Sequence, residues 1–222
     1  MKQIIKTSPP KEFVDFCQTP GVSYCSLSGK PKRALREQLL KDQGYICCYC
    51  GCRIHHDENT HIEHIASQAD HSDHDLDYNN MLAACDGGGK DRKDRITPPH
   101  QQHCDAKKKD KDLPVSPLEK EIEELLIYYE DGTVEGRDNQ NKGNEIIQVL
   151  GLNAGYLVTQ RKNVWDAYSE FEYEDLIKAL EWIREKHEGK YEPYCFVQEQ
   201  CIESYLCIYE SEIESNAEAV TV

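Results

Sequence analysis

Residues 61–65 read HIEHI and place two imidazoles around one carboxylate: His61, Glu63 and His64. A neutral imidazole near pH 7 can accept a proton from water, and a carboxylate can hold a hard divalent cation. Together the two groups can activate water for hydrolysis. A chain with 9 histidines and 41 acidic residues also produces such clusters by chance. The residues that surround this pentapeptide decide between the two interpretations.

A metal-binding spacing lies just upstream, where ICCYCG contains Cys47-x-x-Cys50. Two thiolates at this spacing can bind one Zn²⁺ on a tight turn, with two further ligands from elsewhere in the chain. A redox pair is the alternative, but it favours a long helix after the second cysteine, and GCRIHHDENTHIEHI indicates a turn and a short strand. Cys85 is the candidate for the third ligand. Cys104 is the candidate for the fourth, with His103 as its alternative.

The other cysteines lack ligand spacing. Cys48 and Cys52 flank the turn and are expected to face away from the metal. The rest are expected to be small buried hydrophobic residues, namely Cys17, Cys25, Cys195, Cys201 and Cys207. No run approaches the roughly 20 apolar residues of a membrane span. The first residues lack the apolar core of a secretory signal. We therefore expect a cytoplasmic protein with reduced thiols, some of which hold zinc.

The formal net charge of −15 argues against a protein that attracts nucleic acid over its whole surface. The charge is unevenly distributed, however. Residues 1–114 carry 17 basic and 17 acidic side chains, whereas residues 115–222 carry 9 basic and 24 acidic ones. Basic side chains cluster at residues 30–41 and at residues 107–111. A local phosphate-binding face in the first half is therefore compatible with the composition.

These segments, read in order as CCYC, HIEH, NNMLAAC and HCDAKK, resemble an HNH endonuclease of the ββα-metal, treble-clef type over about residues 44–110. With LGLNAGYLVTQR further on, the chain also resembles the HNH nuclease subunits (PtuB) of Septu and retron-associated antiphage systems. The resemblance departs from the usual pattern in one important place. The second CxxC is broken, because DGGGKDRKDRITPPHQQH separates Cys85 from Cys104.

The resemblance implies a role for individual residues. Glu63 matches the acidic ligand of a catalytic divalent cation, and His64 matches the general base. Asn80 matches the asparagine that fixes the loop and the orientation of the base. Asp105 falls where a second ligand of the catalytic cation stands, and Lys108 where a phosphate contact follows. The neighbouring Lys107 and Lys109 are further candidates for contact with nucleic acid.

The resemblance also implies cofactors and partners. Zinc is expected to be structural, on Cys47, Cys50, Cys85 and Cys104, and Mg²⁺ or Mn²⁺ to be catalytic. The expected substrate is nucleic acid, with DNA favoured over tRNA. The expected partner is an ATPase subunit of the PtuA type, together with a retron reverse transcriptase and its msDNA. The alternative function is a non-catalytic zinc-stapled scaffold that binds nucleic acid or protein.

The sequence segments around these residues predict an α+β protein. Residues 1–43 are expected to form a lead-in and a helix, residues 44–114 the zinc-stapled ββα-metal domain, and residues 115–222 a mainly helical, acidic region that docks a partner. Glu63 and His64 point to opposite sides of an ideal strand, so they need a strand end or a bulge to converge. The segment LLIYYEDGTVEG is expected either to continue a helix or to form a strand and a turn.

Three further helices are expected in the last region, two of them ending at glycines. They cover GNEIIQVLG, AGYLVTQRKNVWDAYSEF and YEDLIKALEWIREKHEG. Trp165 and Trp182 occupy helical core positions and are expected to be packed rather than stacked on bases. The acidic and His-rich stretch DHSDHDLDY is expected to be a solvated loop, and His55, His56 and His61 surface residues of a hairpin.

Overall fold

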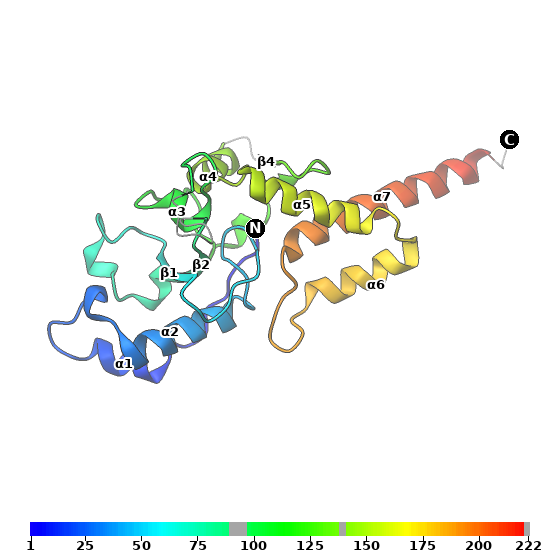
Figure 1. The fold of residues 1–222 in the computed structure, drawn as a ribbon. Coiled ribbons are helices and arrows are strands. Elements are labelled where there is room, and N and C mark those ends of the chain that lie inside the picture. Colours follow the sequence, from blue (N-terminus) through cyan, green and yellow to red (C-terminus); the bar gives the residue numbers. More distant parts are fainter. Residues whose placement is uncertain (89–96, 138–140, 220–222) are drawn as a thin grey trace.

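The computed structural model describes residues 1–88, 97–137 and 141–219. The described chain is an α+β protein with two small antiparallel sheets (Figure 1). Part of the insertion that breaks the second CxxC, residues 89–96, lies outside the described residues. The strands are β1 (Thr60–His64), β2 (Met81–Cys85), β3 (Leu126–Tyr128) and β4 (Val134–Gly136). The α-helices are α1 (Lys11–Cys17), α2 (Gly29–Asp42), α3 (Cys104–Lys108), α4 (Lys142–Leu150), α5 (Gly155–Tyr168), α6 (Tyr173–Arg184) and α7 (Cys195–Ala219).

Strands β1 and β2 carry the HIEHI segment. They pair antiparallel from Thr60 opposite Cys85 to His64 opposite Met81. All five residues of β2 are buried, because α2 and α3 both pack against this strand. The strand β1 ends at His64, so Glu63 and His64 stand at a strand end, although their side chains contact different residues.

The strand alternative for LLIYY is confirmed. Strands β3 and β4 form a hairpin around the turn at Gly132. A short 3₁₀ helix at Lys120–Glu123 precedes them. Gly132 has φ +85°, and a Cβ on it would lie 2.1 Å from the carbonyl oxygen of Val158 in α5. This turn therefore requires glycine, both for its backbone conformation and for its close approach to α5. The helix α4 ends as expected at Gly151, which has φ +62°.

The last helices differ from the sequence prediction. Helix α6 ends at Arg184, short of Gly189, and α7 is a long helix that the sequence did not predict. The two lie side by side and extend away from β1 and β2, as Figure 1 shows. A small separate cluster of apolar residues joins them: Leu176, Ile183, Ile202 and Leu206.

The prediction for the tryptophans was right for one and wrong for the other. Trp165 is buried, whereas Trp182 is 54% exposed and stacks on His187. Trp182 sits on the outer face of α6, because only one side of this helix packs against α7.

The main hydrophobic core crosses all three predicted segments. It includes Phe13 and Leu39 from the first, Leu82 from the second, and Ile122 and Leu150 from the third. The boundaries expected at residues 43 and 114 therefore do not separate cores. No helix in the described ranges is both long enough and apolar enough to cross a lipid bilayer.

Candidate functional site

Cysteine sulfurs from three elements meet at one point. Cys47 and Cys50 lie on the turn, Cys85 ends β2, and Cys104 begins α3. The Sγ atoms of Cys47 and Cys104 are 3.9 Å apart, and those of Cys50 and Cys85 are also 3.9 Å apart. Ligands about 2.3 Å from a tetrahedral Zn²⁺ lie about 3.8 Å from one another. The four predicted ligands thus have the spacing of a zinc site, and the cluster can hold a metal such as zinc.

Local backbone geometry gathers these sulfurs. The N–H of Cys47 donates to the carbonyl of Cys52 at 2.9 Å, and the N–H of Gly51 donates to Cys47 O at 3.1 Å. Gly51 has φ +78°, which closes the turn. The N–H of Cys85 donates to Cys47 Sγ at 3.4 Å, a contact that favours the thiolate form of Cys47.

The cluster holds two donors beyond the predicted four. Cys52 groups with Cys47, Cys50 and Cys85, with all ligand atoms within 4.8 Å of one another. The expectation that Cys52 faces away was therefore wrong, because the turn folds back on itself. His103 groups with Cys104 in the same way, its Nδ1 lying 3.3 Å from Cys104 Sγ. Both candidates for the fourth ligand are thus in place.

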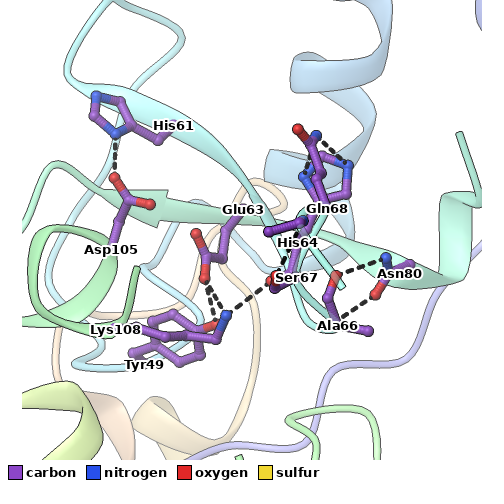
Figure 2. A network of polar contacts seen from close by, with 11 residues as sticks. Tyr49, His61, Glu63, His64, Ala66, Ser67, Gln68, Asn80, Asp105 and Lys108 are labelled. Carbon is purple, nitrogen blue, oxygen red and sulfur yellow. Dashed lines mark hydrogen bonds and ion pairs between the residues drawn. The ribbon is translucent and has the colours of Figure 1, made fainter. Parts of the chain in front are cut away.

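A buried polar network surrounds Glu63 and His64 of β1 (Figure 2). Glu63 is 5% exposed, and its carboxyl group accepts hydrogen bonds from Tyr49 Oη and from Lys108 Nζ, each at 3.0 Å. Burial, followed by a hydrogen bond with Asp105, raises the pKa of Glu63 to about 8, although Lys108 opposes this shift. Two neighbouring carboxyl groups in a buried site disfavour each other's ionisation, and a bound cation would favour the ionised form of both.

Asp105 joins this network to His61. Its Oδ2 lies 2.5 Å from His61 Nδ1, at the first turn of α3. Burial alone would raise the pKa of Asp105, but the hydrogen bonds with His61 and Glu63 outweigh it and lower the pKa. His61 is thus more than a hairpin surface residue. Outside the cysteine cluster, no set of three His, Cys, Asp or Glu ligand atoms lies within 4.8 Å in the part of the chain that the structure describes.

Lys108 departs from its expected role. Its side chain is fully buried, and Nζ donates to the carbonyl of His64 at 2.9 Å in addition to Glu63. It cannot contact a phosphate in this conformation, because β1 and the Glu63 carboxyl group surround its ammonium. Lys107 is half-buried, and Lys109 and Lys111 are exposed, so these members of the lysine run remain accessible.

The His64 ring is held from several sides. Its Nε2 lies 3.0 Å from the carbonyl oxygen of Asp75, and the Tyr24 ring contacts it edge-on with centroids 4.6 Å apart. A carbonyl oxygen can only accept, so Nε2 carries the proton and Nδ1 keeps the lone pair. Gln68 Nε2 lies 3.0 Å from Nδ1. Burial lowers the pKa of His64, which favours the neutral imidazole at pH 7.

Asn80 fixes the loop that faces His64. Its Oδ1 accepts from the N–H of Ala66 at 2.8 Å, and its Nδ2 donates to the carbonyls of Ala66 at 3.1 Å and His74 at 3.2 Å. Since His74 precedes Asp75, this clamp also positions the carbonyl that holds His64. Figure 2 shows Asn80 and Ala66 paired beside His64. The geometry matches the loop-fixing role that the sequence predicts for Asn80.

Sequence reasoning missed Tyr49, Gln68 and Tyr24. Tyr49 stands inside CCYC, and the long-range contact that brings it to Glu63 leaves no local signal. Gln68 and Tyr24 reach His64 through irregular segments, for which periodicity carries no information. Comparison with protein-family models gave no match, and a comparison with curated proteins also gave none.

Proposed function

We propose that this chain is a metal-dependent endonuclease of the HNH, ββα-metal type that hydrolyses phosphodiester bonds in nucleic acid. The observation that carries the proposal is that β1 ends in a buried carboxyl group, Glu63, followed directly by His64, whose lowered pKa favours the neutral imidazole, while Asp105 from α3 acts on Glu63. The order β1, β2, α3 around a cysteine cluster supports it, because this is the arrangement that the family resemblance implies.

The donor set fits a hard divalent cation such as Mg²⁺ or Mn²⁺. Glu63 and Asp105 supply carboxylate oxygens, and sites for Mg²⁺ commonly use one or two carboxylates and leave other positions for water and phosphate. Asp105 helps to raise the pKa of Glu63, as expected for two carboxyl groups that lie close to each other. A bound cation would neutralise charge on the phosphate and leaving oxygens.

The protein's own residues would then act on water and on the substrate. His64 accepts the proton of the attacking water at its unprotonated ring nitrogen. The Asp75 carbonyl holds the ring and its tautomer through the 3.0 Å contact. Asn80 is a positioning residue, since it fixes that carbonyl through the loop. Gln68 occupies the space next to Nδ1, so it must move aside or donate to the same water.

A non-catalytic zinc-stapled module is the second candidate. The observation in its favour is the ammonium group of Lys108, which already neutralises Glu63. In a nuclease, the same lysine would lower the affinity of Glu63 for a cation. The neutral, clamped His64 has no purpose in a scaffold, and for that reason we place the nuclease first.

We further propose that the chain acts as the effector subunit of an antiphage complex with an ATPase of the PtuA type, and with a retron reverse transcriptase and its msDNA. The support is the family resemblance and the charge of residues 115–222, which hold 24 acidic against 9 basic side chains. The ATPase subunit could supply the positive charge for nucleic acid that this region lacks. Co-purification of the full chain with the ATPase tests the partner.

The substrate is tested by a cleavage screen. Plasmid DNA and total tRNA are incubated separately with the purified protein, alone and with its ATPase partner, in Mg²⁺ or Mn²⁺. Cleavage of plasmid DNA that stops when the divalent cation is chelated supports a DNase. Cleavage of tRNA alone would reassign the substrate. A protein that retains its zinc but cuts neither substrate under any condition would favour the scaffold.

A further inference from the structure

The basic cluster of residues 30–41 is not explained by the site described so far. Two of its members have partners of their own: Lys30 pairs with Glu12 at 3.1 Å, and Lys41 pairs with Glu37 at 3.5 Å. These pairs lie on the surface and need no ligand. Arg33 points into solvent. The remaining members, Lys32 and Arg36, lie one helical turn apart on α2 and therefore share a face.

This face of α2 looks toward His64. The Nζ of Lys32 lies 5.2 Å from the centroid of the Tyr24 ring, and that ring contacts His64 edge-on at 4.6 Å. In Figure 2, α2 passes behind His64 and Gln68. A cation on this side of α2 is thus separated from the general base by one aromatic ring.

Arg36 is the unusual member of the pair. Its side chain is half-buried, and its Nε is buried without a hydrogen-bond partner. No ion pair to its guanidinium is found among the described residues. A buried donor without a partner is unfavourable, and a bound ligand, ion or water is one way to satisfy it.

The charge of Arg36 acts on Tyr24, the ring that contacts His64. Burial raises the pKa of Tyr24 to about 12, while the charge of Arg36 acts to lower it. Asp105 and Glu63 act on the same phenol and raise its pKa. The Tyr24 phenol therefore interacts electrostatically with Arg36 and with the two carboxyl groups of the candidate site.

We propose that Arg36, assisted by Lys32, binds a phosphate of the nucleic-acid backbone beside His64. This inference rests on the proposed nuclease function and adds the residue that holds its substrate. A guanidinium binds phosphate through two parallel N–H donors, and a rotation of the half-buried Arg36 side chain would bring Nε among them. The phosphate contact expected from Lys108 is thereby supplied from α2, because Lys108 is buried against Glu63.

The test separates binding from cleavage and from folding. Arg36→Ala, Arg36→Lys and the matched control Arg33→Ala are made in the full chain, each also in a His64→Ala background. Binding of a fluorescent DNA duplex to the His64→Ala forms is measured by anisotropy over a range of salt. Cleavage by the His64-containing forms is measured in parallel, with melting temperature and zinc content as controls for folding.

We expect Arg36→Ala to weaken DNA binding about tenfold or more, and to reduce the slope of log K against log salt by about one. Arg36→Lys should keep most of the salt slope but lose cleavage, because an ammonium group cannot bind in the two-point manner. Arg33→Ala should bind and cut like the parent. The melting temperature of Arg36→Ala should not fall, since the substitution removes an unpaired buried donor.

Three results would overturn the inference in distinguishable ways. If the wild type cuts DNA and Arg36→Ala behaves like Arg33→Ala, Arg36 holds no phosphate while the nuclease function stands. If the wild type neither binds nor cuts, the proposed function and this inference fail together. A fall in melting temperature with unchanged DNA binding would assign Arg36 a structural role only.

Discussion

Asn80 illustrates how a single side chain can control a base that it does not touch. It makes three hydrogen bonds to the backbone of the loop that ends at Asp75, and the Asp75 carbonyl in turn holds His64. Orientation of a general base by a partner that is itself fixed is a common requirement of hydrolytic sites. The family resemblance pointed to Asn80 in the sequence, but the contacts through which it acts on the loop are seen only in the structure.

Asn80→Ala should therefore lower both activity and stability. The substitution leaves the N–H of Ala66 and two carbonyls without their partners, so we expect a loss of about 1–3 kcal/mol in the free energy of unfolding. The cleavage rate should also fall, because the Asp75 carbonyl would no longer hold His64 in place. Urea unfolding and single-turnover cleavage measure the two effects. Asn79→Ala is the control, because Asn79 is exposed and should change neither quantity.

A substitution of Lys108 tests whether this lysine stabilises Glu63 and the His64 carbonyl rather than binding phosphate. Lys108→Met removes the donor to Glu63 and to the carbonyl of His64. We expect the free energy of unfolding to fall by about 2–4 kcal/mol, because buried polar groups lose their partner. Lys109→Met is the matched control and should have little effect on stability. A stable Lys108→Met protein that has lost DNA binding would instead restore the phosphate contact that the sequence predicts.

At the scale of elements, one lysine connects the N-terminal segment to the β1–β2 sheet. The Nζ of Lys6 donates to the carbonyl of Met81 at 2.7 Å and lies 3.6 Å from the centroid of the Tyr78 ring. Burial lowers the pKa of Lys6 from its ordinary value of 10.5 to about 8. The N-terminal segment thus packs a partly dehydrated charge against β2.

This shift predicts a pH dependence of stability. The folded state disfavours the charged form of Lys6, so its destabilising effect is complete below about pH 8 and disappears as the pH rises toward 10.5. Relative to Lys6→Met, the wild type should gain up to about 3 kcal/mol of unfolding free energy between pH 7.5 and 10. Urea unfolding of both proteins over this range measures the difference. A constant difference would show that Lys6 does not titrate in this window.

The elements were predictable to the extent that their signals are local. Helices α2, α4 and α5 follow apolar spacing and glycine stops, and β3 and β4 follow turn chemistry. The long helix α7 was missed because its apolar face is defined only by packing against α5 and α6. Within the site, the sequence alone indicated the zinc ligands, through the cysteine spacing, and the Glu63–His64 pair in HIEHI. The burial of Lys108 and the approach of Cys52 depend on tertiary folding that spacing alone does not encode.

At the scale of the whole molecule, the cysteine cluster joins segments that share one core. It holds the turn at Cys47, the end of β2 and the start of α3 together, and the main core continues from these elements into α4. Metal binding at such a point contributes directly to the free energy of folding. We infer that zinc stabilises the molecule beyond the nuclease residues.

Zinc removal should therefore lower stability throughout the chain. We expect one zinc per chain, and a melting temperature that falls by about 10 °C or more after chelation. Cys104→Ser should lose zinc, whereas Cys25→Ser, at an exposed position outside the cluster, should retain it. Elemental analysis and thermal unfolding check both. Zinc loss without a change in melting temperature would confine the metal to a local role.

The central claim is that His64 is the general base of a nuclease, and a comparison of two histidines tests it most directly. Cleavage rates of the wild type, His64→Ala and His71→Ala are measured in Mg²⁺ or Mn²⁺ on the substrate that the screen identifies, with zinc content as a control. His71 lies on the loop that Asn80 clamps but is half-exposed, and it lacks a contact to His64 among the described residues. We predict that His64→Ala lowers the rate by about 10²–10⁴-fold and that His71→Ala has little effect. A zinc-loaded His64→Ala protein that cuts as fast as the wild type would contradict the account.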